Sequence, residues 1–354
     1  QPDLLAVPAL WWHVHELLFG FAMAVVMGFV LTAVQNWTGI RGTHSWALAG
    51  LFSLWLLPRL LFWTSAPLPL ILAIESLFIL GCAVAVAQRV IKTKRWKNLF
   101  FVPLFLLAMV INALSYISIN SHPVLDIQLP FTSSVLWQAM IWWFALLLSI
   151  MGARVIPFFT ATKLGVDKPT SHLWLESAAN IPLILLFILS LIPSLNAQWS
   201  APLLLLAGVF QLIRLYRWQG LKTLHEPLLW SLHLGYAFIP LSLFVMGFKL
   251  FPGFWHVLLH LIAIGSIGGV ILAMIARVTM GHTGRNIYQG PNMTWAFSAI
   301  ACAALVRTFA ILWWPQWMNE LLWLAGGLWC FAFGLFAFKF GPMLIKPRID
   351  GHPG

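Results

Sequence analysis

Short basic segments alternate with long apolar stretches along this chain, and this pattern constrains its fold more than any other feature. Lysine and arginine residues outside the apolar stretches fall almost entirely on every second connection. Such alternation is typical of proteins that cross a membrane many times, because cytoplasmic loops keep an excess of Lys and Arg. The loop 88–98 has the densest run of cations and marks the cytoplasmic side. We therefore predict that the N-terminus of this sequence lies outside and that the C-terminus is cytoplasmic.

Eleven apolar stretches are long enough to cross a bilayer as helices, which requires about 20 apolar residues each. Only 8% of the residues are charged, whereas a soluble domain has roughly 25%, so a large soluble protein is excluded. No long polar linker divides the chain, which predicts one all-α transmembrane helical bundle over residues 1–354. The predicted spans are 12–35, 46–63, 68–88, 98–117, 132–151, 173–192, 200–214, 228–248, 254–276, 294–314 and 319–341.

Several classes of function are disfavoured by what the sequence lacks. The net charge of +11 comes from short loops beside apolar spans, so anionic lipid rather than nucleic acid is the expected partner. Cys82, Cys302 and Cys330 lie inside apolar stretches without a CxxC or CxxCH motif, which argues against iron–sulfur clusters, disulfides and covalently attached haem. No P-loop, GxSxG or HExxH motif is present, which argues against an ATPase, hydrolase or metalloprotease.

Ionisable residues at membrane depth are the candidates for a functional site, because inserting one costs about 2.5–3.5 kcal/mol. His122, in an outer loop, and His352, near the C-terminus, are instead expected to be solvated. The charge pattern places one group of ionisable residues towards the outer side: His13, His15, Glu16, His256 and His260.

The outer group contains two motifs. In a regular helix His13 and His15 diverge by about 200°, whereas His13 and Glu16 share a face. One histidine could therefore ligate a metal while Glu16 orients it or handles protons; the alternative is a set of polar residues at the lipid headgroups. His256 and His260 are four residues apart, a spacing that suits metal binding, although only one of them could be axial to a given haem iron. Alternatively, His256 and His260 form hydrogen bonds to neighbouring helices and bind no metal.

Glycines follow His260 at positions 265, 268 and 269. Small residues in a membrane helix favour close helix packing, and a smooth face of this kind could also give clearance to a flat cofactor. Glu75 lies in the middle of a span, where it is either a proton carrier or an ion-pair partner of Arg59 or Arg307.

Further candidates lie towards the cytoplasmic side. His233, with Tyr236 near it, is a candidate haem ligand or a hydrogen-bonded packing residue. The segment with Arg277, His282 and Arg285 could bind haem propionates or another anion through charge-assisted hydrogen bonds, or it could be an ordinary basic helix end. The segment 154–160, which begins with Arg154, has the same two interpretations.

Five strings in the chain resemble a known family: WWHVHELLFGF (11–21), FVLTAVQNWTGIRG (29–42), ARVIPFFT (153–160), HLGYAF (233–238) and HLIAIGSIGGVILAMIARVTMGHTGR (260–285). They are similar to the NnrS family of bacterial cytoplasmic (inner) membrane proteins. The resemblance implies haem b and copper as cofactors and a role in nitric oxide metabolism and nitrosative stress. It also implies twelve spans, so we expect an initial helix to precede the given sequence. It favours His13, His15, His233, His260 and His282 as site residues.

The resemblance and the residues together predict a haem and copper membrane protein that binds nitric oxide at an open metal site and reduces it. His15 and His260 are the first candidates for metal ligands, with His13 or His256 completing a copper-type site. A second metal beside a haem could hold two NO molecules together. Glu16 and Glu75 are the candidate catalytic proton carriers, and a quinol or a small redox protein would donate electrons.

Two other functions remain open from the sequence. The chain could be a non-catalytic binder or sensor of NO or metal nitrosyls. It could also transport a small anion or metal, although no inverted repeat or pair of broken helices of the kind found in carriers is evident.

Overall fold

The computed structural model describes residues 7–119 and 132–351 of the chain. These residues form α-helices joined by short turns, with brief 3₁₀ and π-helical segments and no strand. His122 and His352, which were expected to be solvated, lie outside the described residues.

Ten helical segments of the described residues are long and apolar enough to span a membrane. The remaining predicted span, 46–63, corresponds to the shorter apolar helix Ser45–Leu61. Each of the eleven predicted stretches is therefore helical, and the prediction of an all-α protein with many membrane spans is confirmed. The side of the membrane on which each loop lies stays a prediction.

The chain divides into two compact units, Gln1–Met140 and Ile141–Gly354. A single domain over residues 1–354 therefore stays a prediction.

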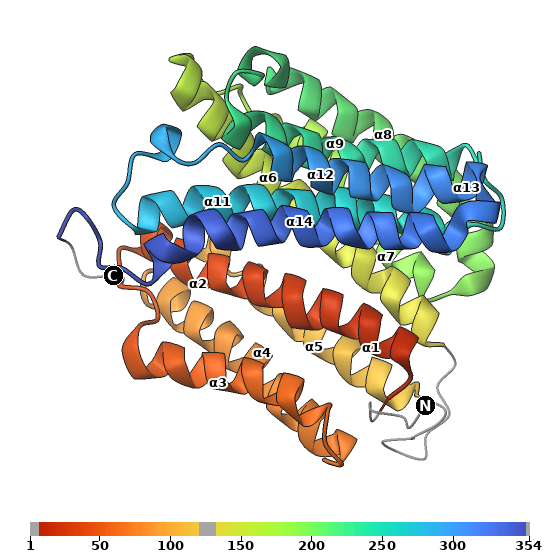
Figure 1. Cartoon of the computed structure of the whole chain (residues 1–354), viewed down its shortest axis with the longest axis horizontal. Coiled ribbons are helices and arrows are strands. Elements are labelled where there is room, and N and C mark those ends of the chain that lie inside the picture. The colour runs from red at the N-terminus through yellow and green to blue at the C-terminus, as the bar shows by residue number, and fades with distance from the viewer. Residues whose placement is uncertain (1–6, 120–131, 352–354) are drawn as a thin grey trace. The chain divides into compact units, whose positions relative to one another are not determined.

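Unit 1 is a group of helices that pack around α4. Its first span consists of α1 (Ala9–His15), the π-helical segment η1 (Glu16–Ala22) and α2 (Met23–Thr38). Three further helices follow, α3 (Ser45–Leu61), α4 (Leu68–Lys92) and α5 (Phe101–Ile117), with the 3₁₀ turn η2 (Trp96–Asn98) before α5. Helix α4 contacts α2, α3 and α5 (Figure 1). Residues at the centre of unit 1 therefore meet side chains from several helices.

Unit 2 is arranged around the buried helix α9 (Pro227–Gly247). It contains most of α6 (Ser133–Leu164), followed by α7 (Leu173–Ser190), α8 (Pro193–Arg217) and the 3₁₀ turn η3 (Gly220–Thr223). Helix α9 contacts α8 on one side, and on another it contacts the span made of α10 (Trp255–His260), η4 (Leu261–Gly268) and α11 (Gly269–His282). The rest of unit 2 comprises η5 (Ile287–Gln289), α12 (Thr294–Leu305), η6 (Val306–Ala310), α13 (Ile311–Trp313), η7 (Pro315–Trp317) and α14 (Met318–Leu344) (Figure 1).

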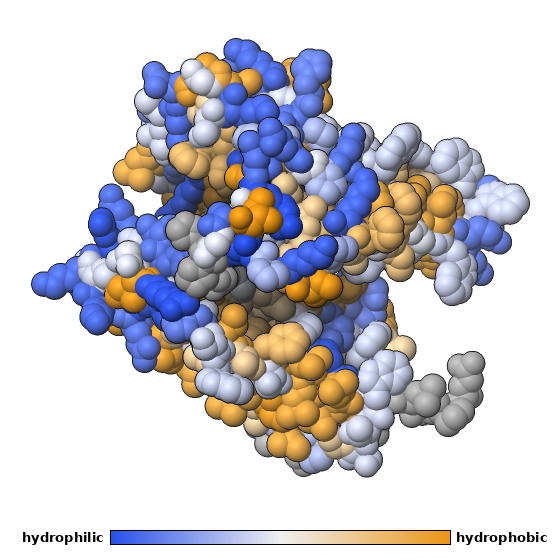
Figure 2. Space-filling model, turned by 60° about the vertical axis from the view of Figure 1, so that its left-hand side comes forward, coloured by the Kyte–Doolittle hydropathy of each residue, from blue (hydrophilic) through white to orange (hydrophobic). Residues whose placement is uncertain are grey.

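Hydrophobic side chains are exposed on these helices as well as buried between them. On α3, Leu48, Phe52, Leu57 and Leu60 are all exposed, and Figure 2 shows such hydrophobic surface in orange. A helix that is apolar on every side belongs either in a large core or in a membrane. Because these side chains are not covered within the described residues, lipid is the environment that suits them.

Basic loops on alternate connections of the chain meet within each unit. In unit 1, Nε of Arg89 donates to the carbonyl oxygen of Arg41 at 3.0 Å. In unit 2, Lys163 forms an ion pair with Glu226 at 2.9 Å. The loops 36–45 and 88–98 therefore lie together, as do the loops 152–172 and 214–227.

Arg214, the last residue of the predicted span 200–214, lies within a longer helix. Helix α8 continues to Arg217, and Arg214 is only 1% exposed. Its guanidinium pairs with Glu176 at 3.0 Å and donates to Oγ and the carbonyl oxygen of Ser149 at 2.7 and 2.8 Å. The charge is tolerated inside the bundle because these groups replace the water that it would otherwise need.

Three spans contain a π-helical segment, η1, η4 and η6. Two of these segments begin directly after a histidine that the sequence singled out, His15 and His260. Such segments are rare and are often found at functional sites. His15 and His260 therefore lie at points where the regular helix is interrupted.

Candidate functional site

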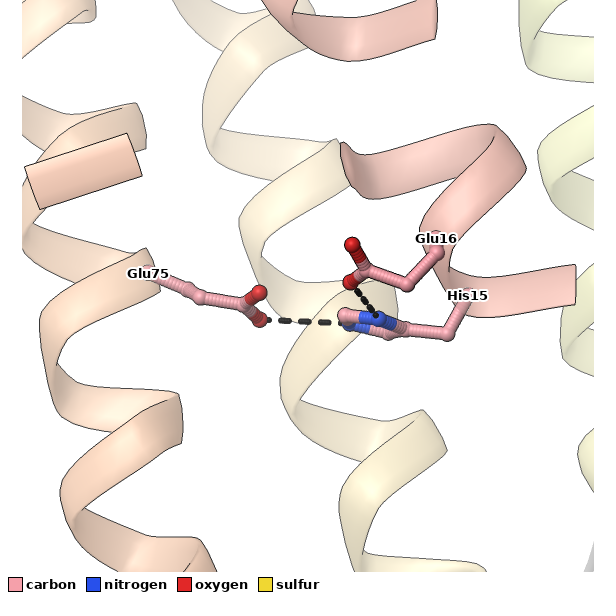
Figure 3. A group of neighbouring side chains, drawn as sticks. All are labelled: His15, Glu16 and Glu75. Atoms are coloured by element: carbon pink, nitrogen blue, oxygen red, sulfur yellow. Dashed lines mark hydrogen bonds and ion pairs between the residues drawn. The ribbon is translucent and has the colours of Figure 1, made fainter. Parts of the chain in front are cut away.

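His15 lies at the centre of unit 1, fully buried at the end of α1. Its Nδ1 atom is 3.1 Å from Oε1 of Glu16, and its Nε2 atom is 3.2 Å from Oε2 of Glu75. Figure 3 shows the imidazole between the two carboxylates, one from η1 and one from α4. Candidate ligand atoms of all three residues lie within 4.8 Å of one another. The two predicted proton carriers and a predicted metal ligand thus form one cluster.

Aromatic rings hold the imidazole of His15 in place. Trp11 stacks on it with a centroid distance of 4.5 Å and an interplanar angle of 12°. The Trp11 indole is fixed in turn, because its Nε1 donates to the carbonyl oxygen of Ser115 at 3.0 Å. Phe62 and Tyr116 meet the imidazole edge-on, at 5.6 and 5.3 Å between centroids. The ring therefore has little freedom to turn away from the carboxylates.

Besides His15, Glu75 contacts polar groups from α3 and α5. Its Oε2 accepts from Nδ2 of Asn112 at 2.9 Å and from the hydroxyl of Tyr116 at 3.0 Å. Its Oε1 forms an ion pair with Nη2 of Arg59 at 2.9 Å. Of the two partners that the sequence left open for Glu75, the structure shows Arg59.

Arg59 joins the two carboxylates of the cluster. Its Nε and Nη2 donate to Oε2 and Oε1 of Glu16 at 3.0 and 3.2 Å, while Nη2 also pairs with Glu75. Its Nη1 donates to the carbonyl oxygen of Trp55 at 2.8 Å. A planar guanidinium can make several directed contacts of this kind at once, which an ammonium cannot match.

The charges of this cluster balance only when one more positive charge is present. Glu16 and Glu75 contribute two negative charges and Arg59 one positive charge, so a neutral His15 leaves a net charge of −1. Both ring nitrogens of His15 face acceptor oxygens, since Oδ1 of Asn112 also lies 3.0 Å from Nε2. Both nitrogens can donate only in the imidazolium form. A proton on His15 therefore completes both the charge balance and the hydrogen bonds.

The same geometry decides which groups fit against His15. A metal ion would have to take the place of a proton between carboxylates that Arg59 already pairs. A flat porphyrin does not fit at the ring in this arrangement, because both nitrogens are engaged and Trp11, Phe62 and Tyr116 surround it. His15 as a metal or cofactor ligand stays a prediction.

Unit 2 contains the other predicted ligands, of which His260 is oriented by its own helix. Its Nδ1 contacts the carbonyl oxygens of His256 and Val257 at 3.0 and 3.2 Å. Donation from Nδ1 leaves Nε2 as the basic nitrogen, which is the tautomer that metal-ligating histidines adopt. His260 is half-buried and His256 is exposed. His260 as an axial ligand stays a prediction.

His233 is buried in α9, with 7% of its surface exposed. Its Nε2 lies 2.9 Å from Oγ1 of Thr160, the last residue of the 154–160 segment. Its Nδ1 is buried without a hydrogen-bond partner among the described residues. An orphaned imidazole nitrogen of this kind fits a ligand role, although the backbone of Gly220 lies close to it, since a Cβ at that glycine would be 2.6 Å from Nδ1.

The predicted anion-binding residues are not equally buried. Arg277 is 5% exposed, and its guanidinium carbon lies 3.7 Å from the ring centre of Phe159. Its Nη2 donates to the hydroxyl of Tyr288 at 3.1 Å. By contrast, Arg154 and His282 are exposed and Arg285 is half-buried. Propionate or anion binding by these residues stays a prediction.

The predicted outer metal centre draws on residues of both units. His13, which is exposed, and His15 belong to unit 1, whereas His256 and His260 belong to unit 2. A shared copper site of these histidines stays a prediction.

Sequence reasoning missed Asn112, Tyr116 and Trp11, and it did not pair His15 with Glu16. A signal for the first two was present, because Asn112 and Tyr116 are four residues apart in an apolar span and so share a helix face. It also missed a second buried network in unit 2, where Gln211 donates to Oγ of Ser149 at 2.8 Å and accepts from the hydroxyl of Tyr236.

No curated protein matches this chain significantly. The family model described as NnrS protein matches residues 1–348, which is nearly the whole chain. The chain therefore belongs to the NnrS family and is a multi-pass membrane protein related to nitric oxide.

Proposed function

We propose that this protein is a haem-containing oxidoreductase of the bacterial cytoplasmic membrane that binds and reduces nitric oxide. The observation that supports it most is the His15 imidazole held between the carboxylates of Glu16 and Glu75 inside a chain of the NnrS family. Reduction of two NO molecules to N₂O and water consumes two electrons and two protons. A proton-handling cluster at membrane depth is what such a reaction needs, and a quinol or small redox protein would supply the electrons.

The cluster has an order in which a proton can pass through it. Glu16 has a side chain that is 16% exposed, whereas the side chain of Glu75 is only 3% exposed. The imidazolium of His15 carries a proton on each nitrogen, and Nε2 can release its proton to Glu75. Imidazole suits this step because the neutral ring still donates through its other nitrogen. Arg59 stabilises both carboxylates in their charged form between transfers.

Either His260 or His233 would hold a haem in unit 2. His260 presents the appropriate tautomer, and His233 has an unpartnered buried nitrogen. A haem bound there would supply an open iron position to which NO binds. Copper, which imidazole also suits, is the alternative metal for His260 together with His256. Arg277 and Arg285 would pair with the propionates.

The test compares NO consumption and N₂O formation by purified protein with a chemical reductant. His15→Asn and Glu75→Gln are expected to lower turnover by about 10²–10⁴-fold, while the optical spectrum of the NO-bound haem stays unchanged. Glu320→Gln, which alters an exposed carboxylate in the first turn of α14, serves as the matched control.

Three outcomes would contradict the proposal. Wild-type protein that binds NO without consuming it would be a non-catalytic binder. Full turnover in His15→Asn would remove the proton-handling role of the cluster. Purified protein without stoichiometric haem would exclude the haem site altogether.

A further inference from the structure

A small cavity lies in unit 2 between α9, the η4–α11 span and α12, with a volume of about 10 Å³. Its walls include Phe238 from α9, Gly265 from η4, and Phe297 and Ile300 from α12. A cavity needs about 10–15 Å³ to hold one water molecule. The space is therefore sized for one very small molecule and is too small for a haem or a quinol.

Glycines bring the walls of this cavity together. A Cβ at Gly265 would lie only 2.4 Å from Cγ of Phe238, so the Phe238 ring rests directly on the backbone of η4. A Cβ at Gly269 would lie 3.5 Å from Cα of Gly235. Of the two uses that the sequence left open for these glycines, the structure shows close helix packing. The cavity is the space that this tight contact leaves beside it.

The chemistry of the walls disfavours water as the occupant. Ser231 provides the one polar side chain among the lining residues, and its hydroxyl is buried without a partner among the described residues. A buried water typically makes about three hydrogen bonds, and this site offers one side-chain hydroxyl for that purpose. A small uncharged molecule with little need for hydrogen bonds is held at lower cost.

We propose that this cavity binds one molecule of nitric oxide as the free gas. NO is diatomic and uncharged, and it is the molecule to which the family is related. The inference rests on the proposed function in its choice of gas, and it adds a binding position distinct from any metal. Ser231 is two residues from His233, and Gly265 is five residues from His260, so the cavity lies on the two helical spans that bear the candidate haem ligands. A molecule bound here would therefore lie next to the two spans that bear the candidate haem ligands.

The direct test is crystallography of the purified protein after exposure to NO and, separately, to xenon, a larger apolar probe that needs no hydrogen bonds. We expect difference density at this position with both gases. Ordered water bound to Ser231, with neither gas entering, would overturn the proposal. Because gas density does not depend on turnover, protein that holds NO here but forms no N₂O would contradict only the proposed function.

Two variants change lining residues of α9 and α12, and a third serves as a control outside the cavity. Ala301→Leu adds bulk to a lining residue and is expected to abolish both gas densities, whereas Cys302→Leu on the exposed side of α12 is expected to preserve them. Ser231→Ala is smaller than the native residue and keeps the apolar walls, so NO and xenon are expected to remain. Loss of NO in Ser231→Ala, or persistence of NO in a folded Ala301→Leu protein, would refute the assignment.

Discussion

Oε2 of Glu75 lies 3.2 Å from Nε2 of His15, although the two residues are 60 positions apart and come from different membrane spans. The contact joins the only buried carboxylate among the described residues to a fully buried imidazole. It gives unit 1 a polar centre that its apolar helices would not otherwise possess. Single substitutions can test whether that centre, and the glycine contacts of unit 2, act as the structure indicates.

Removal of the Glu75 charge is expected to destabilise the protein. In Glu75→Gln, Arg59 and His15 would be left with Glu16 as their one carboxylate partner, and breaking a buried ion pair costs about 3–5 kcal/mol. Thermal unfolding of the purified protein measures the change. Glu320→Gln should leave the melting temperature where it is, and an equal shift in both variants would argue against a special role for the Glu75 contacts.

Arg59→Lys is expected to be poorly tolerated although the positive charge is retained. Arg59 contacts Glu16, Glu75 and the carbonyl oxygen of Trp55 with different guanidinium nitrogens. A lysine ammonium cannot reproduce that fork, so we expect lower thermal stability and slower NO turnover. Arg348→Lys, in the exposed pair with Asp350, is the matched control, since exposed ion pairs add little to stability. Wild-type behaviour of Arg59→Lys would show that charge alone suffices.

Gly20→Ala is expected to disturb the cluster through packing. A Cβ at this position would lie 2.7 Å from Oε2 of Glu16 and 3.1 Å from Nη2 of Arg59, so the carboxylate must move. Gly28 lies further along the same span, where a Cβ would meet nothing within 4 Å, and Gly28→Ala should be neutral. Gly20→Ala should therefore lower NO turnover and the melting temperature, whereas Gly28→Ala should not. Equal values for the two variants would contradict the close contact between Gly20 and Glu16.

Gly265→Ala is expected to separate α9 from η4. The added methyl group would clash with the Phe238 ring, and overpacking of this kind costs about 1–3 kcal/mol. Gly326→Ala in α14 meets nothing within 4 Å and provides the comparison. The relevant measurements are the melting temperature and the haem content of the purified protein.

Replacement of the histidines one at a time is expected to assign the metals. Either His260→Ala or His233→Ala should lose haem bands, because these two imidazoles have a nitrogen suited to ligation. His15→Asn should keep them, because both nitrogens of His15 already face oxygens. Optical spectra together with metal analysis distinguish the cases, and retention of both metals in every variant would refute this choice of ligands.

The sequence was sufficient for the helical architecture, because hydrophobic length and loop charge are local properties. It could not show that Arg214 is buried within the bundle, because its charge is compensated by Glu176 and Ser149 from other helices. It recognised His15, Glu16 and Glu75 separately as costly residues in a membrane. It could not show that they meet, because their contact depends on how α1 and α4 pack and on the π-helical segment between His15 and α2.

Segment η1 also determines how α1, which ends at His15, is rotated about the helix axis relative to α2. A π-helical stretch uses i to i+5 hydrogen bonds and so accommodates a residue that a uniform α-helix would not. If the same seven residues Glu16–Ala22 formed a regular α-helix, α1 would be rotated by about 100° relative to α2. The His15 imidazole would then face a different neighbour while α2 kept its own. The π-helical turn after His15 therefore orients the His15 side chain towards α4.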